Sequence, residues 1–312
     1  MSDSLLNGLV TTDPLRTGPY RPRQIQTEPT QAGTAISTRR RALRFFARRP
    51  GLVLAILVIA VMLVAAGFPD LLSGQDPLAG IPREKLQGPN PQHLFGTDEL
   101  GRDLFSRVAH GAALSLKATV IAVALAGTVG GFIGLLAGFV GGWADQVLMR
   151  VIDVLLAIPA LLLSLALITA LGYGTVKIAV AVGAAIVANF ARLMRAEVLR
   201  VRQAVYVEAA HSIGARWYSV LARHVLPNAY GPVLVLATLE FGVAILSVSA
   251  LSFLGYGAPA PAPEWGALVA DGRSYLATAW WLTTLPGLTV AATVLALNRI
   301  SRALDGEWTA GR

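Results

Sequence analysis

The sequence predicts an all-α polytopic membrane protein with six transmembrane helices and one amphipathic helix lying along the cytoplasmic face. The chain has 312 residues, of which 54% are hydrophobic and only 14% charged, and its mean hydropathy is +0.60. Six largely uncharged stretches reach the roughly 20 residues that a helix needs to cross the bilayer core. The net charge of +8 gathers beside these stretches without an aromatic and basic stripe, which favours membrane topology over nucleic-acid binding.

The two ends of the chain are predicted to lie outside the membrane. Residues 1–43 are polar and rich in Thr, Pro and Arg, and they lack the apolar segment of a signal peptide. We expect them to form an uncleaved, disordered cytoplasmic extension, and we expect residues 301–312 to form a cytoplasmic tail. The chain has no cysteine, which excludes disulfides, thiolate metal sites and cysteine nucleophiles.

The membrane domain is predicted to occupy residues 44–300. Lys177 and Arg192 flank the short apolar stretch of the fourth span, Ile178–Ala191, and their long side chains can carry the charges to the two interfaces. An outer loop, 70–112, and a cytoplasmic loop, 200–226, connect spans. The six spans are predicted at about 50–69, 114–140, 152–172, 176–196, 228–254 and 279–299.

The orientation follows from the distribution of basic residues, because segments rich in Arg and Lys stay in the cytoplasm. Nine arginines precede the first span. This places the stretch Asp70–His110 outside, where six acidic residues accompany four basic ones. The stretch Arg192–Arg223, with six arginines, then lies inside. Both termini are therefore predicted to be cytoplasmic.

The cytoplasmic loop 200–226 contains an amphipathic pattern. Glu208 lies off the apolar face, Gly214 permits a tight turn, and a second amphipathic helix begins near Trp217. This helix-turn-helix segment is either an interfacial helix that anchors the loop or a helix that docks in the groove of a soluble partner. Spacing alone leaves both interpretations open. Four apolar residues recur at helical spacing: Val201, Val205, Ala209 and Ile213.

One pattern in this loop resembles a known family. Glu208-Ala209-Ala210, Gly214 and the later Leu226-Pro227 resemble the EAA loop of permease subunits of binding-protein-dependent ABC importers. Further segments are similar to the second, C-type permease of the dipeptide, oligopeptide and nickel family, and the resemblance covers roughly residues 44–298. These segments are GTDELGRDLFSRVAHGAALSL (Gly96–Leu116), GFVGGWADQVLMRVIDVLLAIPALLL (Gly138–Leu163) and ALSFLGYGAPAPAPEWGALV (Ala250–Val269).

The resemblance implies the transmembrane fold of type I ABC importers in the bacterial plasma membrane. A second homologous permease would complete the pathway for peptides or a related small solute, and an extracytoplasmic solute-binding protein would deliver it. Two separate ATPase subunits would bind ATP and Mg and hydrolyse ATP, so this chain would be no enzyme and would hold no cofactor. The residues implied in ATPase coupling are Glu208, Ala209, Ala210 and Gly214.

The acidic segment around Asp98 has two interpretations. Asp98, Glu99 and Asp103 could suggest a metal or substrate site. We prefer a structural or binding-protein docking role for Asp98, Arg102 and Asp103, because Gly96-Thr97-Asp98 is typical of a turn and cap. Arg102 and Asp103 are then expected to pair locally.

Glu240 is an ionisable residue inside the predicted fifth span. Such residues are costly in the membrane and are functional candidates. Glu240 either lines the pathway and attracts a cationic substrate group, or it is neutral or paired within the bundle; both alternatives stay open.

Other features of the spans suggest packing. Gly127/Gly131, Gly130/Gly134 and Gly134/Gly138 have the GxxxG spacing of closely packed helices. Pro159 is expected to bend the third span. Asp145 and Asp153 are expected to pair locally with Arg150.

The sequence also bears on two other classes of function. An intramembrane enzyme is disfavoured, because no HExxH or GxSxG motif is present and the four histidines are predicted to lie in loops. The chain has no GxxxxGK[ST] phosphate loop, so energy must come from elsewhere. The alternative is a stand-alone secondary transporter or another polytopic protein without an ATPase partner, but such transporters usually show inverted repeats and several buried charges.

Overall fold

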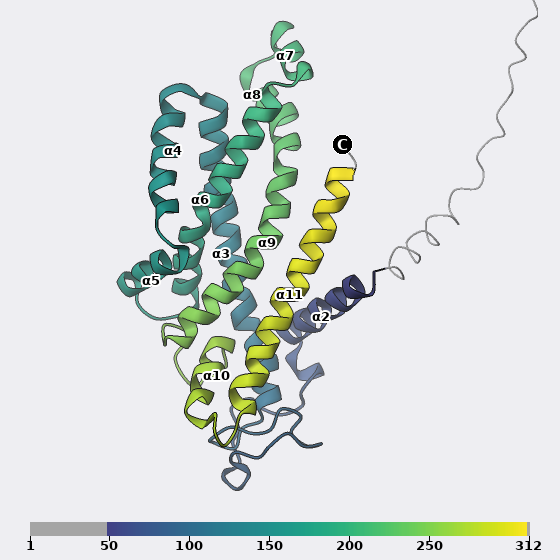
Figure 1. Cartoon of the computed structure of the whole chain (residues 1–312), viewed down its shortest axis with the longest axis vertical. Helices are drawn as coiled ribbons and strands as arrows, with labels where there is room; N and C mark the ends of the chain where they lie inside the picture. Colours follow the sequence, from purple (N-terminus) through teal and green to yellow (C-terminus); the bar gives the residue numbers. More distant parts are fainter. Residues whose placement is uncertain (1–48, 311–312) are drawn as a thin grey trace, which may run out of the picture. The chain divides into compact units, whose positions relative to one another are not determined.

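The computed structural model describes residues 49–310, apart from the side chains of His211 and 304–310. The described residues form helices and no strand; the only bridges join Gly80 to Arg102 and Thr97 to Asp103. The extension predicted over residues 1–43 lies outside the described part. The main helices (Figure 1) are α2 (Pro50–Gly67), α3 (Leu104–Val140), α4 (Gly142–Ala157), α5 (Ala160–Leu171), α6 (Thr175–Arg202), α7 (Val205–Ser212), α8 (Trp217–Val220), α9 (Leu226–Phe253), α10 (Trp265–Gly272) and α11 (Trp281–Ala310).

Five of the described helices are long and apolar enough to cross a membrane, and a bent pair makes six if it counts as one span. Several extend beyond the predicted spans. α3 begins ten residues before position 114, because Asp103 caps its N-terminus by accepting a hydrogen bond from the Ser106 N–H. α11 continues to Ala310, so most of the predicted tail 301–312 is helical.

The predicted third span, 152–172, is not one helix. α4 and α5 meet at an angle of 95°. Pro159 has no N–H to continue the helix and disfavours helical geometry at the residue before it, and Ile158 is extended with ψ of 129°. The bend expected at Pro159 therefore separates two helices.

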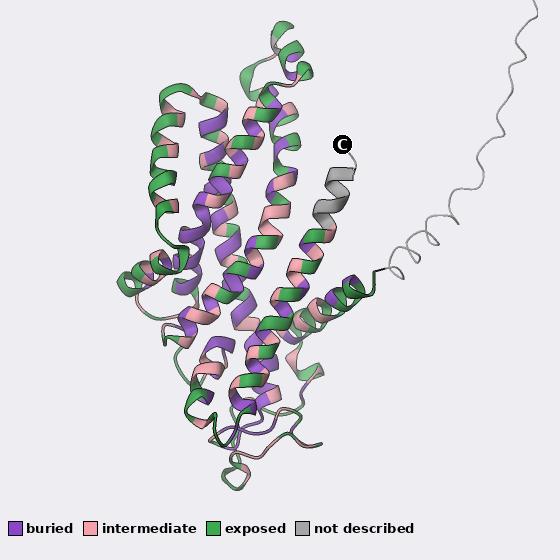
Figure 2. Cartoon of the chain, in the orientation of Figure 1, coloured by how far each residue is buried: buried purple, intermediate pink, exposed green. Residues whose placement is uncertain are grey.

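The contact between α3 and α6 is built on glycine. Gly134 packs directly against the backbone of α6, where an added Cβ would lie 2.8 Å from the Met194 Cβ and still closer to the Ala191 carbonyl oxygen. Gly130 meets Val187 in the same way. Figure 2 shows buried residues concentrated along α3 and α6, whereas α4 and α5 are largely exposed. The GxxxG spacing thus brings two helix backbones together.

Two tryptophans tie α10 to the first turns of α3, and α11 to the segment that precedes α3. The Trp265 Nε1–H donates to the Val108 carbonyl oxygen at 2.9 Å, and the Trp281 Nε1–H donates to the Thr97 carbonyl oxygen at 3.3 Å. The segment 69–103 and α10 lie together at one end of the helices, and α7 lies at the opposite end (Figure 1). The two regions singled out in the sequence are therefore far apart.

We expect Gly134→Ala to lower the unfolding temperature of the protein in detergent, because the new methyl group cannot enter the α3–α6 contact without separating the backbones. The expected cost is about 1–3 kcal/mol, the usual range for overpacking. Gly127→Ala is the matched control, since its Cβ would find the nearest atom 3.6 Å away. Equal stability of the two variants would contradict the packing role.

Candidate functional site

The helix α7 exposes one face and buries the other. Glu208 and Ala209 are exposed, whereas Val207 and Ala210 are buried against the rest of the protein. Ala210 thus supports the helix from inside, while Glu208 and Ala209 are accessible to a partner.

The apolar stripe predicted through this loop is not a continuous buried face. Val201 is buried at the end of α6, but Val205 and Ile213 are 81% and 85% exposed. The reason is that α6 ends at Arg202 and the chain turns at Gln203, so the helical register does not carry over into α7. Five exposed apolar side chains form what we call the α7 surface: Val205, Tyr206, Ile213, Trp217 and Tyr218.

Gly214 ends α7 in the left-handed conformation, with φ of +79°. The Ala215 N–H donates to the Ala210 carbonyl oxygen at 3.1 Å, which is the bond of a Schellman motif and needs a residue like glycine at this position. The chain then reverses into α8. An exposed apolar surface of this kind lies at a membrane interface or is covered by a partner.

The segment after α8 joins the α7 surface to the membrane domain. Residues Leu221–Val225 form a π-helical turn, in which the Leu226 N–H donates to the Leu221 carbonyl oxygen. Pro227 follows and supplies no donor for a regular helical bond. The helix is nevertheless continuous from Trp217 to Phe253, so it connects the loop mechanically to the middle of the bundle.

The histidines do not all lie in loops as predicted. His110 lies in α3, His211 in α7 and His224 in the π-helical turn; His93 alone lies in a loop. The described residues contain no group of three or more His, Cys, Asp or Glu that could hold a metal ion.

Glu240 lies in the middle of α9 and is buried, with 7% of its surface exposed. The Asn189 Nδ2–H of α6 donates to its Oε1 at 2.8 Å, and its Oε2 has no partner among the described residues. An apolar cavity of about 430 Å³ lies nearby, lined by Val123, Thr238 and Phe241 among others, but Glu240 does not line it. Asn189 is thus the partner of Glu240 within the bundle.

Asp98 is the centre of the cluster at the opposite end. Its Oδ1 accepts the backbone N–H groups of Leu100 and Arg102 at 2.8 and 2.9 Å. Its Oδ2 accepts from Arg102 Nε and Arg107 Nη1, both at 2.6 Å. Burial raises the pKa of Asp98, but these hydrogen bonds and charges outweigh burial and bring its pKa below the ordinary value. The carboxylate therefore stays charged and holds the loop together.

Asp103 has a different partner from the one predicted. Besides capping α3, its Oδ2 lies 2.9 Å from His93 Nδ1, and His93 Nε2 lies 3.3 Å from Glu84 Oε2. Arg102 pairs with Asp98 and Glu99 instead. The expected Arg102–Asp103 pair is wrong because the cap points Asp103 away from its neighbour. His93 and Glu84 carry no local pattern that would single them out.

The acidic residues of α4 also pair across helices. Asp145 accepts two hydrogen bonds from Arg195, at 2.5 and 2.7 Å, and Asp153 lies 2.7 Å from Arg192. Both arginines belong to α6. The expected local pairing with Arg150 is wrong, because α4 packs alongside α6.

Comparisons with known proteins agree on one family. The model of the family described as "Binding-protein-dependent transport system inner membrane component" matches residues 130–308. The dipeptide transport system permease protein DppC of Alkalihalophilus pseudofirmus is 37% identical over 88% of this chain and 91% of its own. The probable D,D-dipeptide transport system permease protein DdpC of Escherichia coli is 40% identical, covering 80% and 84%.

Two further matches extend this result. The glutathione transport system permease protein GsiD of Pectobacterium atrosepticum is 37% identical, covering 84% of this chain and 87% of its own. A solved amino acid ABC transporter aligns with a TM-score of 0.51 at 19% identity, covering 64% of this chain and 94% of that one. The structural likeness shows the fold alone, which is the transmembrane fold of type I importers.

We expect Asp98→Asn to destabilise this end of the protein, because among the described residues it removes the only carboxylate that contacts both Arg102 and Arg107. Breaking a buried ion pair by removing one partner typically costs about 3–5 kcal/mol, so the unfolding temperature in detergent should fall clearly. Glu99→Gln is the control, since Glu99 is partly exposed and touches Arg102 alone at 3.2 Å. A similar small effect for both variants would refute the central role of Asp98.

Proposed function

This chain belongs to the family of binding-protein-dependent transport system inner membrane components, and on that premise we propose that it imports peptides or a related small solute as one permease of an ATP-driven importer. A second homologous permease would form the other half of the translocation pathway. The identity of 37–40% to named peptide and glutathione permeases, over 80% or more of the chain, carries the proposal. The alternative of a stand-alone secondary transporter finds no support among these relatives.

Energy and solute would come from partners of this chain. We assign ATP and Mg binding, and ATP hydrolysis, to two separate ATPase subunits, and solute delivery to an extracytoplasmic binding protein. The family description names dependence on a binding protein, and the sequence lacks a phosphate loop. The chain itself is a translocation subunit.

The proposed orientation places α7 in the cytoplasm together with both termini, and the segment 69–103 and α10 outside. The protein is a multi-pass inner-membrane protein. The bias of basic residues supports the orientation, since Arg192–Arg223 carries six arginines. The two groups of residues lie at opposite ends of the helices, as this orientation requires (Figure 1).

The α7 surface would seat in a cleft of an ATPase subunit. Glu208 and Ala209 point outward and would meet the partner, with the Glu208 charge selecting a basic group or a helix N-terminus. The buried Ala210 would hold α7 in place by packing against the rest of the protein, and Gly214 would turn the chain toward α8. A displacement of the cleft would then reach α9 through the continuous helix Trp217–Phe253. This helix-in-groove arrangement gives the exposed apolar residues a partner to bury them.

The outer cluster would have an architectural role toward the binding protein. Asp98 and Arg102 fix the turn before α3, and Asp103 starts the helix. We propose that they shape the outer face on which the binding protein docks, without contacting the solute.

The importer itself is tested by copurification from membranes in mild detergent. We expect the chain to copurify with a second permease and with ATPase subunits, and the reconstituted assembly to take up solute only when ATP and the binding protein are present. A chain that purifies alone and transports in vesicles lacking ATP would refute the proposal.

We expect Gly214→Val and Glu208→Arg to uncouple ATP hydrolysis from uptake. Valine strains the left-handed turn at Gly214, and the new arginine reverses the charge offered to the partner. Uptake should fall by about tenfold or more, while membrane insertion and residual ATP hydrolysis persist. Gly142→Val is the matched control, because Gly142 also has positive φ, of +57°, and open space around its Cβ. Unchanged uptake in both test variants would favour a helix that only anchors the loop.

A further inference from the structure

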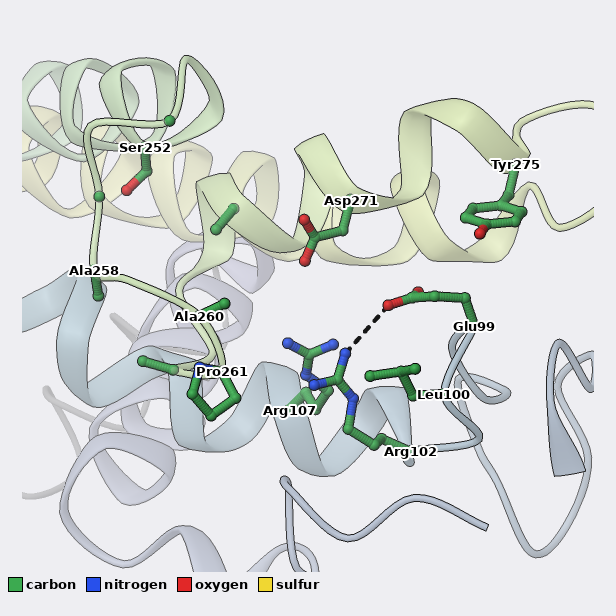
Figure 3. Close-up of a pocket in the computed structure, with 14 residues that line it drawn as sticks. Glu99, Leu100, Arg102, Arg107, Ser252, Ala258, Ala260, Pro261, Asp271 and Tyr275 are labelled. Carbon is green, nitrogen blue, oxygen red and sulfur yellow. Dashed lines mark hydrogen bonds and ion pairs between the residues drawn. The ribbon is translucent and has the colours of Figure 1, made fainter. Parts of the chain in front are cut away.

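A cavity of about 540 Å³ opens at the outer end of the protein. Its walls come from the segment before α3, the first turns of α3, the end of α9, the loop between α9 and α10, and α10 itself (Figure 3). The polar side chains that line it are Glu99, Arg102, Arg107, Ser252, Asp271 and Tyr275. Its size lies in the range of cavities that hold small ligands, roughly 300–1,000 Å³.

Two buried side chains on this cavity have polar atoms without partners. Arg107 is 3% exposed and its Nε has no acceptor, although its Nη1 reaches Asp98. Ser252 is 2% exposed and its Oγ has no partner among the described residues. Buried polar atoms without hydrogen bonds are uncommon and destabilising. Both side chains line the cavity, so its wall includes polar groups that the described residues do not satisfy.

Opposite charges face each other across the cavity without closing on one another. The guanidinium groups of Arg102 and Arg107 lie on the α3 side, and the Asp271 carboxylate on α10 points toward them (Figure 3). Among the described residues Asp271 forms no hydrogen bond and no ion pair, whereas Arg102 is paired with Glu99 and Asp98. Asp271 is thus the charged group on this wall that a ligand can engage.

The charged side chains that line the cavity indicate which kind of ligand it can bind. Two carboxylates, Glu99 and Asp271, and two guanidinium groups, Arg102 and Arg107, line the cavity. A simple anion would be attracted to the arginines but repelled by the carboxylates, and the reverse holds for a simple cation. A solute that carries both charges satisfies both walls at once.

We propose that this cavity is a binding site for a zwitterionic solute of the size of a short peptide, with its ammonium group toward Asp271 and its carboxylate toward Arg107, whose Nε has no acceptor among the described residues. This binding site rests on the proposed importer function. It would receive the solute on the outer side, before the solute passes the level of Glu240. Direct closure of Asp271 onto the arginines is the competing explanation.

The test uses the whole importer assembly in lipid nanodiscs without the binding protein, and saturation-transfer NMR with three probes. These are dialanine, N-acetyl-dialanine, which lacks the ammonium group, and dialanine amide, which lacks the carboxylate. We expect dialanine to bind about tenfold more tightly than either analogue, because each analogue loses one charged contact.

The variant Asp271→Asn should abolish the preference for the free ammonium group and retain the preference for the free carboxylate. Asp76→Asn is the matched control: Asp76 is exposed on the outer segment, does not line the cavity, and its asparagine still offers an acceptor to the Leu78 N–H. Equal binding of the three probes, or identical selectivity of Asp271→Asn and the wild type, would refute the proposed binding site.

The uptake assay separates this result from the importer function. If ATP-driven uptake persists although the binding site is refuted, the importer function stands; if no uptake is seen, the importer function is refuted as well.

Discussion

The close contact between α3 and α6 is the constraint on which the rest of the structure depends. Glycines at 130, 134 and 138 let the two backbones meet with no side chain between them. The start of α3 carries Arg107 at the outer cavity, and the end of α6 leads directly into α7. Because the pair is packed backbone to backbone, it fixes the distance between these two regions and leaves other helices to accommodate movement.

The end of the protein that carries the segment 69–103 is held together by charges that the protein mostly satisfies internally. Asp98 compensates two arginines, and Asp103 joins the helix cap to His93. Such pairs offset a desolvation cost only when their geometry is good, and both contacts to the Asp98 Oδ2 are 2.6 Å long. Because Asp98 already satisfies much of the charge of the two arginines, Asp271 lines the same cavity without forming an ion pair to any described residue.

Sequence was sufficient where the information is local. The lengths of the apolar stretches predicted the helices that can cross a membrane. Gly214 predicted a turn, and the structure has a Schellman motif there. Ion pairs between residues far apart in the sequence could not be predicted: Asp145 and Asp153 pair with arginines of α6 and not with Arg150. The outward direction of Val205 and Ile213 depends on a break at Gln203 that the helical spacing did not indicate. The bend at Pro159 was predicted from the local sequence, but its angle of 95° was not.

One helix joins the α7 surface to the cavity lined by Asp271. The helix Trp217–Phe253 begins beside the α7 surface, and Ser252 near its end lines the outer cavity. Midway, Asn189 ties Glu240 to α6, and separating them would leave polar groups unpaired in the membrane core, which is costly. The π-helical turn Leu221–Val225 departs from regular geometry, although its Val225 is fully buried in the core. A displacement that entered at α7, as the proposed coupling requires, would therefore meet this irregular turn before it met the contact between Glu240 and Asn189.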